Sequence, residues 1–176
     1  VVSGQVKLFV VSPAGQEKVI EIISPGQSFA EALVFLNKPY IVNAQALADT
    51  VLVNVSKRGV VSEIEQDPHF ALHMLAGVSR RLHGLVQDVE ADALRSGMQR
   101  LIGYLLRDVE LDPASGKNTV TISLPASKAT IASRLSLTPE YFSRVLHELE
   151  AQQLITIDRR DILILDVQKL LGYDAQ

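Results

Sequence analysis

The chain has 176 residues and contains no cysteine. Without a thiol it cannot form a disulfide, a zinc site built on thiolates or a cysteine nucleophile. It also lacks the run of about 20 apolar residues that a membrane-spanning helix needs. A nucleophile elbow, a P-loop and a glycine-rich dinucleotide motif are absent as well. We therefore expect neither an enzyme nor a membrane protein, and the lack of cysteine fits a cytoplasmic location.

A strong excess of positive charge is missing too. The chain is 47% apolar and 21% charged, with a formal net charge of −3. From Asp112 onward it carries seven Lys and Arg against eight Asp and Glu. This composition is typical of a globular protein and excludes a generally basic nucleic-acid-binding chain. Any binding to DNA must then depend on locally placed side chains.

The first third of the chain has the pattern of a β domain. Short apolar runs alternate with turn sequences such as Ser12–Gln16 and Ser24–Gln27, and residues 29–36 favour one or two helical turns. The runs predict four strands, at residues 6–11, 18–23, 41–47 and 51–55. This pattern favours a sandwich or barrel. Because Val1–Val6 resembles the end of a strand entering a turn, we expect part of the barrel to precede Val1.

Two helices are predicted next, separated by a break at Asp67–Pro68. Ser56 is suited to cap a helix over residues 57–66, and Pro68 begins the longest periodic run of the chain. Apolar residues recur in this run at alternating spacings of four and three, at Ala71, Leu75, Val78, Leu82, Leu85 and Val89. This heptad-like seam predicts a homodimer. The alternative is an internal helix that packs on the β domain.

The last part of the chain has the pattern of a winged helix-turn-helix. Ser96–Gly97 is a candidate hinge before a helix over residues 98–109, a loop over 112–118 and a strand over 119–124. A helix from Ser127 to Leu135 is followed by the short turn Ser136–Leu137 and a second helix. Apolar runs at 154–157 and 162–165 flank the polar tip Asp158–Asp161. They predict a β-hairpin, which would form the wing.

The second helix, over residues 138–149, has one apolar and one polar face. Thr138 and Pro139 are a typical helix start. Phe142, Val145, Leu146 and Leu149 fall on one side, whereas the opposite side carries Glu140, Ser143, Arg144 and His147. Arg to guanine and a carboxylate to cytosine are favourable pairings in the major groove. The alternative is an ordinary amphipathic surface helix.

These features together resemble the Crp/Fnr family of bacterial transcription regulators. The similarity runs from Ser3–Lys7 through Pro25–Ala32 to the wing. It implies an α+β fold with a jelly-roll-like β-barrel of the cyclic-nucleotide-binding type at residues 1–66. It also implies a dimerisation helix at 67–95 and a winged helix-turn-helix at 96–176. The partners implied are double-stranded DNA, a second copy of the chain and RNA polymerase.

Within this family, Glu140–Arg144 resembles the Glu-x-x-Ser-Arg motif of the Fnr and Dnr branches. The resemblance implies a palindrome of TTGAT-like half-sites, where Arg144 meets guanine, Glu140 cytosine and Ser143 thymine. Contacts with the DNA backbone, which position the protein without specifying sequence, are expected from a second group. Its members are Lys128, Thr130, Arg134, Thr138, Tyr141, His147, Arg159 and Arg160.

The effector is less constrained by the resemblance. Ala30–Glu31 matches the opening of the family's phosphate cassette, but residues 38–45 lack the arginine that pairs with a cyclic phosphate. We therefore expect no cyclic nucleotide and a structural role for Glu31, through hydrogen bonds from backbone N–H groups. Without cysteine, we expect no iron–sulfur cluster in this segment. A regulatory module that binds a cyclic nucleotide without acting on DNA is the alternative function.

Residues 29–32 and 44–46 resemble the Dnr type, regulators of denitrification, which implies a haem-dependent response to nitric oxide. The sequence does not identify the haem ligand, which a segment before Val1 could supply. His69, His73 and His83 lie on the long predicted helix, and His147 lies on the recognition helix. His69 and His73 are four residues apart, as in a two-histidine metal site. No acidic or histidine partner supports such a site, so we assign no metal.

Overall fold

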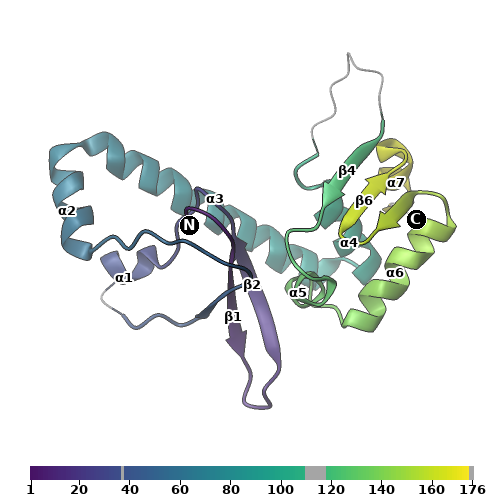
Figure 1. The fold of residues 1–176 in the computed structure, drawn as a ribbon, viewed down its shortest axis with the longest axis horizontal. Coiled ribbons are helices and arrows are strands. Elements are labelled where there is room, and N and C mark those ends of the chain that lie inside the picture. The colour runs from purple at the N-terminus through teal and green to yellow at the C-terminus, as the bar shows by residue number, and fades with distance from the viewer. Residues whose placement is uncertain (37, 110–117, 175–176) are drawn as a thin grey trace. The chain divides into compact units, whose positions relative to one another are not determined.

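The computed structural model describes residues 1–36, 38–109 and 118–174. The chain forms two compact units, Val1–Val89 and Glu90–Gln176. The division falls inside the long helix α3 (Pro68–Leu94), which Figure 1 shows as one continuous element. The first unit contains the β structure expected for a sensory domain, and the second contains the expected winged helix-turn-helix. The predicted α+β fold class is thus confirmed.

The first unit is built on a three-stranded antiparallel sheet in the order β2-β1-β3. Its strands are β1 (Val6–Val11), β2 (Glu17–Ile23) and β3 (Asn43–Ala46). Alternation along β1 and β2 points Val6, Leu8 and Ile23 to one side, where they form a buried cluster with Phe29 and Val42 packed against it. Burial of each such side chain contributes about 1.5–3 kcal/mol.

Three helices complete the first unit as predicted. They are α1 (Glu31–Phe35), α2 (Lys57–Gln66) and the part of α3 up to Val89. The Ser56 hydroxyl caps α2 by accepting a hydrogen bond from the N–H of Gly59 at 3.0 Å. Asp67 separates α2 from α3, and its carboxylate accepts a hydrogen bond from the N–H of His69 at 2.9 Å. The predicted break at Asp67–Pro68 is therefore confirmed.

The strand predicted over residues 51–55 is wrong. Only Val51 pairs, in an isolated antiparallel bridge with Ser3, and the residues after it are not in a strand. Val53 and Val55 are 69% and 59% exposed. The sequence has strand propensity here, but among the described residues no second strand lies alongside to pair with it. The strand predicted over 41–47 is also shorter, at Asn43–Ala46.

The second unit begins with the end of α3 and contains two further layers. Its helices are α4 (Gly97–Leu106), α5 (Lys128–Arg134), α6 (Pro139–Ala151) and α7 (Val167–Asp174). Its strands, β4 (Val120–Ser123), β5 (Ile155–Asp158) and β6 (Asp161–Ile164), form an antiparallel sheet in the order β4-β6-β5. Helix α4 ends three residues before the predicted end. Apart from Asn118, the loop predicted over 112–118 lies outside the described residues.

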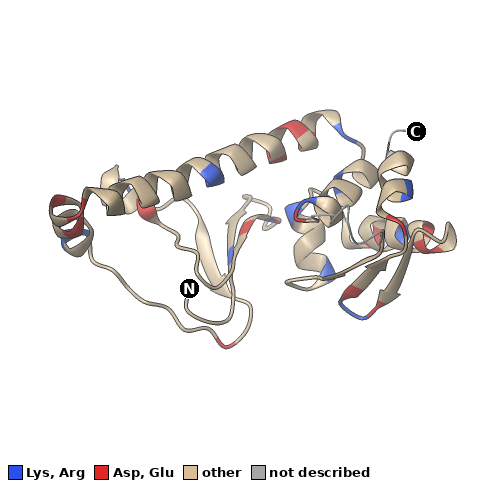
Figure 2. Ribbon diagram, turned by 90° about the horizontal axis from the view of Figure 1, so that it is seen from above, with Lys and Arg blue, Asp and Glu red and all other residues tan. Residues whose placement is uncertain are grey.

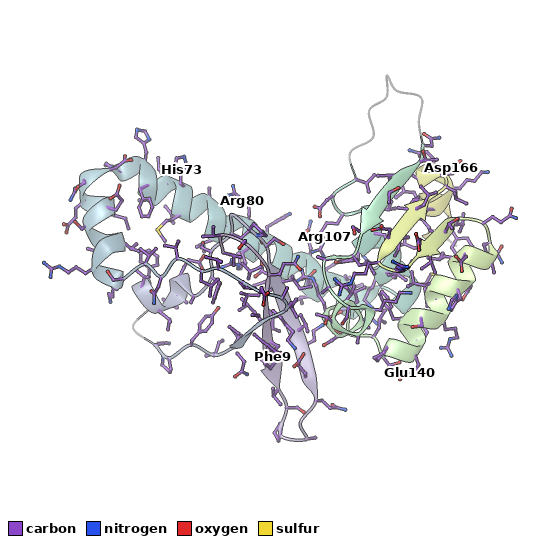
Figure 3. The ribbon with its side chains drawn as sticks, viewed as in Figure 1. Phe9, His73, Arg80, Arg107, Glu140 and Asp166 are labelled. Atoms are coloured by element: carbon purple, nitrogen blue, oxygen red, sulfur yellow. The ribbon has the colours of Figure 1, made fainter. Side chains whose placement is uncertain are left out.

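Helix α7 was not predicted. The Asp166 carboxylate starts it by accepting hydrogen bonds from the N–H groups of Gln168 and Lys169 at 3.0 and 3.1 Å (Figure 3). Leu170 is fully buried and anchors α7 in the core of the second unit. The aspartate cap was visible in the sequence, but the helix is too short for a clear apolar period.

The core of the second unit contains side chains from every helix after α3 and from the sheet. Its fully buried members include Leu101, Ile102, Leu105, Ile131, Phe142, Leu146, Leu149, Ile162, Ile164 and Leu170. This core holds α5 and α6 together independently of the exposed polar contacts. In the part of the chain that the structure describes, no helix has the length and apolarity needed to cross a bilayer.

Candidate nucleic-acid interface and sensory site

Helix α6 has the predicted start. The Thr138 hydroxyl caps it by accepting a hydrogen bond from the N–H of Tyr141 at 3.2 Å, and Pro139 occupies the first turn. A proline is favourable there because its missing N–H would have no partner within the helix. Glu140 lies in the same turn, where the positive end of the helix dipole stabilises a carboxylate.

The two faces of α6 separate as the sequence predicts. Phe142, Val145, Leu146 and Leu149 are between 0% and 2% exposed. On the other side Glu140, Arg144 and His147 are exposed, and Ser143 is half-buried. Glu140 stands at the open start of the helix (Figure 3). The buried face thus anchors α6, and the opposite face presents a carboxylate, a hydroxyl and a guanidinium.

Arg144 is held by an aromatic neighbour. Its guanidinium lies over the ring of Tyr141, with 4.9 Å between the guanidinium carbon and the ring centroid. A cation–π contact of this kind contributes about 0.5–1 kcal/mol at an exposed site. Tyr141, which we predicted as a backbone contact, therefore also limits the directions in which Arg144 can point.

Helices α5 and α6 pack against each other as a helix-turn-helix. Ile131, Ala132 and Leu135 of the first helix and its end are buried against the core. The turn is closed by a hydrogen bond from the N–H of Leu137 to the carbonyl of Ala132 at 2.9 Å. Ser136 has a left-handed φ of 55°, which turns the chain sharply between the two helices. The predicted Ser136–Leu137 turn is confirmed.

The predicted wing is also present, as the hairpin of β5 and β6. Asp158 pairs with Asp161, so Arg159 and Arg160 form a two-residue tip. Arg159 adopts a φ of 55°, a region that glycine or asparagine fills at less cost. The tip is fixed by a hydrogen bond from the N–H of Leu124 to the carbonyl of Arg160 at 2.9 Å. Both arginine side chains are exposed.

The other residues predicted to contact the DNA backbone differ in their surroundings. Lys128 and Thr130 are half-buried on α5, and the Thr130 hydroxyl lies 2.8 Å from that of Ser127. Burial raises the pKa of the Tyr104 phenol, and the charge of nearby Arg134 lowers it by less. His147 lies 3.5 Å from the carboxylate of Glu150.

Charges of both signs are mixed over the second unit, as Figure 2 shows. The wing tip places Arg159 and Arg160 between Asp158 and Asp161. Among the described residues of this unit, lysine and arginine therefore do not form a uniformly basic face. This distribution agrees with the charge balance of the sequence.

The predicted seam on α3 is largely open to solvent. Leu75, Leu82 and Val89 are 61%, 62% and 69% exposed, and Val78 is 42% exposed. Ala71 and Leu85 are half-buried. Leu72 and Val86, on the same helix and each 59% exposed, add to this apolar stripe. Exposed apolar area of this extent is typical of a surface that binds a partner.

A cluster of charged side chains surrounds Glu31 in the first unit. Arg81 of α3 reaches the carboxylate of Glu31 with Nη1 at 2.7 Å, and its Nη2 donates to the carbonyl of Ser28. Its Nε lies 2.9 Å from the carboxylate of Glu21 but makes no hydrogen bond there, so this contact is an ion pair. The Ser28 hydroxyl donates to Glu31 at 2.5 Å. One guanidinium thus serves two carboxylates.

This cluster sets the protonation of Glu31. Burial raises the pKa of its carboxyl group, but the hydrogen bonds from Ser28 and from its own backbone N–H and the nearby Arg81 charge lower it by more. Glu31 is therefore ionised more readily than a free glutamate. Burial also raises the pKa of Tyr40, whose hydroxyl adjoins the backbone of Ala30 and the same charged groups.

Sequence reasoning missed the role of Arg81. Residues 38–45 contain no arginine, so the cation beside Glu31 comes instead from a helix 50 residues further along the chain. The heptad pattern marked Arg81 only as a polar residue beside the seam. Arg80, next to it, is exposed (Figure 3). The period of a helix places Arg81 on its inner side, but no local pattern identifies Glu21 and Glu31 as its partners.

The histidines of the first unit lie on the surface of α3. His69, His73 and His83 are all exposed on α3, and His73 is labelled in Figure 3. His83 instead lies 3.2 Å from the side-chain amide of Gln87. Among the described residues, no three His, Asp or Glu side chains are grouped as metal binding requires. These histidines therefore do not fit a haem pocket inside the unit.

Both units match known protein families. Residues 1–67 match the cyclic nucleotide-binding domain, and residues 99–173 match the Crp-like helix-turn-helix domain. The chain is 28% identical over 166 residues to the global nitrogen regulator of Nostoc sp. (strain PCC 7120 / SAG 25.82 / UTEX 2576). That alignment covers 92% of this chain and 73% of the relative.

Solved structures show the same fold over the whole chain. The structure of FixK2 from Bradyrhizobium japonicum matches with a TM-score of 0.78 at 20% identity, over 100% of this chain and 86% of that one. A putative cyclic nucleotide binding protein from Ruegeria pomeroyi DSS-3 matches with a TM-score of 0.61 at 30% identity. That match covers 99% of this chain and 75% of the other.

The charged cluster around Arg81 leads to a prediction about stability. Replacing Arg81 by alanine leaves Glu21 and Glu31 close together without their cation and should lower the free energy of unfolding at pH 7 by about 1–3 kcal/mol. Arg80→Ala, one residue away at an exposed position, is the matched control and should change it little. Thermal unfolding of both variants measures the difference.

The same cluster predicts the pH dependence of that loss. The pKa of Glu31 is lowered in the folded chain, so its ionised form adds stability above its ordinary value of 4.5. This contribution disappears as the pH falls through the lowered pKa. The gap in melting temperature between wild type and Arg81→Ala should therefore narrow from pH 7 towards pH 3. A gap of constant size would contradict the assignment.

Proposed function

The chain belongs to the Crp/Fnr family of DNA-binding transcription regulators, and on that premise we propose that it reads a palindromic DNA site as a homodimer. The observation that carries the proposal is the division of α6 into two faces. Four buried apolar side chains hold one face, while Glu140 and Arg144 are exposed within the first two turns. The first turns of a recognition helix are the part that reaches base edges.

The exposed residues have the chemistry of base recognition. The Arg144 guanidinium offers two parallel donors to guanine O6 and N7, and the Glu140 carboxylate accepts from cytosine N4. Ser143 lies between them on the same face and can contact a thymine. We propose half-sites of the TTGAT type, because Glu140–Arg144 has the Glu-x-x-Ser-Arg pattern. The wing-tip residues Arg159 and Arg160 would contact phosphates beside this sequence.

A homodimer follows from the apolar stripe on α3. Two copies that bury Leu75, Leu82 and Val89 against each other would remove side chains from water that are now about two-thirds exposed. Two-fold symmetry would then present two copies of α6 to half-sites about one helical turn of DNA apart. The proposed dimer thus accounts for the exposed seam and implies a palindromic DNA site.

Control by an effector is proposed at the cluster around Glu31. A site that binds a cyclic nucleotide needs a cation that is available to pair with the phosphate. Here Arg81 already pairs with both Glu21 and Glu31. We therefore propose that cyclic AMP is not the effector. A haem-dependent response to nitric oxide, which the Dnr resemblance favours, is retained as a proposal without an assigned ligand.

Regulation would act through a shift between conformations. An effector bound near Glu31 changes the equilibrium only if it binds one arrangement of the first unit better than another. Arg81 connects that region to α3, which also carries the proposed dimer seam. On DNA, the bound dimer would act on transcription through RNA polymerase.

The base-reading assignment predicts a specific loss of affinity. Arg144→Ala should weaken binding to a TTGAT palindrome by about 1–3 kcal/mol and remove discrimination at the guanine. Arg159→Ala, the matched arginine at the wing, should weaken binding to all sequences alike. It should also reduce the slope of log affinity against log salt concentration by about one. Fluorescence anisotropy with single-base-substituted duplexes measures both. Wild-type discrimination in Arg144→Ala would refute the assignment.

The proposed seam predicts a change of oligomeric state. Leu82→Glu places a charge at the centre of the stripe and should convert the dimer to a monomer, because a buried unpaired carboxylate is costly. Leu171→Glu, at a 46% exposed leucine of α7, is the control and should leave the dimer intact. Sedimentation velocity distinguishes the two species. A Leu82→Glu dimer as tight as wild type would exclude this seam.

The effector proposal predicts the response to two candidate ligands. Cyclic AMP at millimolar concentration should leave the melting temperature unchanged, since binding to the folded state alone would raise it. Haem binding, if it occurs, should give a Soret band that shifts with nitric oxide. Stabilisation by cyclic AMP would overturn the first statement, and a spectrum equal to that of free haem would end the haem proposal.

A further inference from the structure

Asp92, in the last turn of α3, joins three elements of the second unit. One of its carboxylate oxygens lies 3.0 Å from Nη1 of Arg100 on α4. The other accepts a hydrogen bond from the Ser136 hydroxyl at 2.7 Å. Ser136 is the residue that turns the chain between α5 and α6. A single side chain therefore connects the end of α3 to the start of the recognition helix.

Hydrogen bonds hold the turn at Ser136 in place, so the contact with Asp92 also constrains the start of α6. The N–H of Ser136 donates to the carbonyl of Ser133 at 3.2 Å, and that of Leu137 donates to Ala132 at 2.9 Å. Thr138 then caps α6 directly. Glu140 follows Ser136 by only four residues, so a displacement of the turn moves the base-reading residues with it.

A close approach at Gly97 supports the same junction. A Cβ atom at this position would lie 2.4 Å from Cε1 of Tyr141 and 2.9 Å from Cδ2 of Leu137. Only glycine lets the first turn of α4 pack this closely beneath the first turn of α6. Tyr141 in turn carries the guanidinium of Arg144 on its ring. The sequence suggested a flexible hinge at Ser96–Gly97, whereas in the structure Gly97 is tightly packed.

The Asp92 contacts are directional, and the core does not depend on them. The Asp92 side chain is 38% exposed and that of Arg100 is 15% exposed. Stability of the unit comes mainly from its fully buried apolar side chains, including Leu101 and Phe142. Hydrogen bonds to a charged acceptor are about twice as strong as neutral ones and more restrictive in geometry. Loss of the Asp92 carboxylate should therefore allow α6 to change its direction while the unit stays folded.

We propose that Asp92 is a positioning residue for DNA reading. With Ser136 and Arg100 it fixes the direction of α6 relative to the last turn of α3, and so determines which half-site spacing the dimer accepts. Val89 of the proposed seam lies three residues before Asp92 in the same helix. Successive base pairs are about 3.4 Å apart, so a small change of angle would shift each α6 by one base pair. The proposal rests on the proposed DNA-binding function.

The test compares DNA duplexes that differ only in spacing. Full-length protein is titrated with TTGAT-type palindromes of the preferred spacing, with one base pair removed or added, and with a single half-site. Asp92→Ala and Ser136→Ala should each weaken binding to the preferred palindrome by about tenfold, as expected for loss of a hydrogen bond to a charged group. Binding to the altered spacings and to the single half-site should change less than twofold.

Matched variants separate the proposed role from general stability. Glu90→Ala removes an acid of the same helix that pairs with Arg95 at 3.0 Å, and it should keep the wild-type spacing preference. Asp92→Asn keeps an oxygen that can accept from Ser136 and should restore most of the preference. The double variant of Asp92→Ala and Ser136→Ala should bind like Asp92→Ala alone, because Asp92→Ala already removes the contact with Ser136.

Two results would overturn the proposal. One is an unchanged spacing preference in both Asp92→Ala and Ser136→Ala. The other is an equal loss on every duplex, including the single half-site, which would assign Asp92 to the stability of the unit. Ser136→Ala removes only one hydroxyl from an exposed turn, so it remains informative if Asp92→Ala lowers the melting temperature. If wild-type protein does not prefer the palindrome over scrambled DNA, the proposed function fails instead.

Discussion

The burial of one face of α6 is the constraint on which the proposed DNA-reading surface depends. Phe142, Val145, Leu146 and Leu149 are removed from water, which fixes the rotation of the helix about its own axis. Because the helical period is fixed, Glu140 and Arg144 must then face outward. Each buried side chain contributes about 1.5–3 kcal/mol, more than an exposed ion pair could. Packing of the apolar face therefore places the exposed polar side chains of α6. Polar contacts make only smaller adjustments to the direction of the helix.

Polar contacts of α3 occur in both units, and each set includes a partner that is distant in sequence. Arg81 meets Glu21, Ser28 and Glu31 in the first unit. Asp92 meets Arg100 and Ser136 in the second. Eleven residues separate the two on one continuous helix. Helix α3 thus combines an exposed apolar stripe with polar contacts to other elements within each unit.

Local patterns were enough to predict most helices and the turn chemistry. The caps at Ser56, Ser127 and Thr138, the break at Asp67 and the two faces of α6 all depend on neighbouring residues, so the sequence contains them. The strand expected at 51–55 failed because a strand needs a partner, which propensity does not supply. The contacts of Arg81 with Glu21 and Glu31 and that of Asp92 with Ser136 join residues 44 to 60 positions apart, so they depend on tertiary packing and could not be predicted.

The central claim is that paired α6 helices read a palindrome, and in vitro selection of bound sequences from a random duplex library tests it most directly. The account predicts enrichment of two inverted half-sites about one helical turn apart. Each half-site should contain an invariant guanine opposite Arg144, in a TTGAT-like context. Enrichment of a single unpaired motif, or of no motif beyond the starting library, would contradict the account.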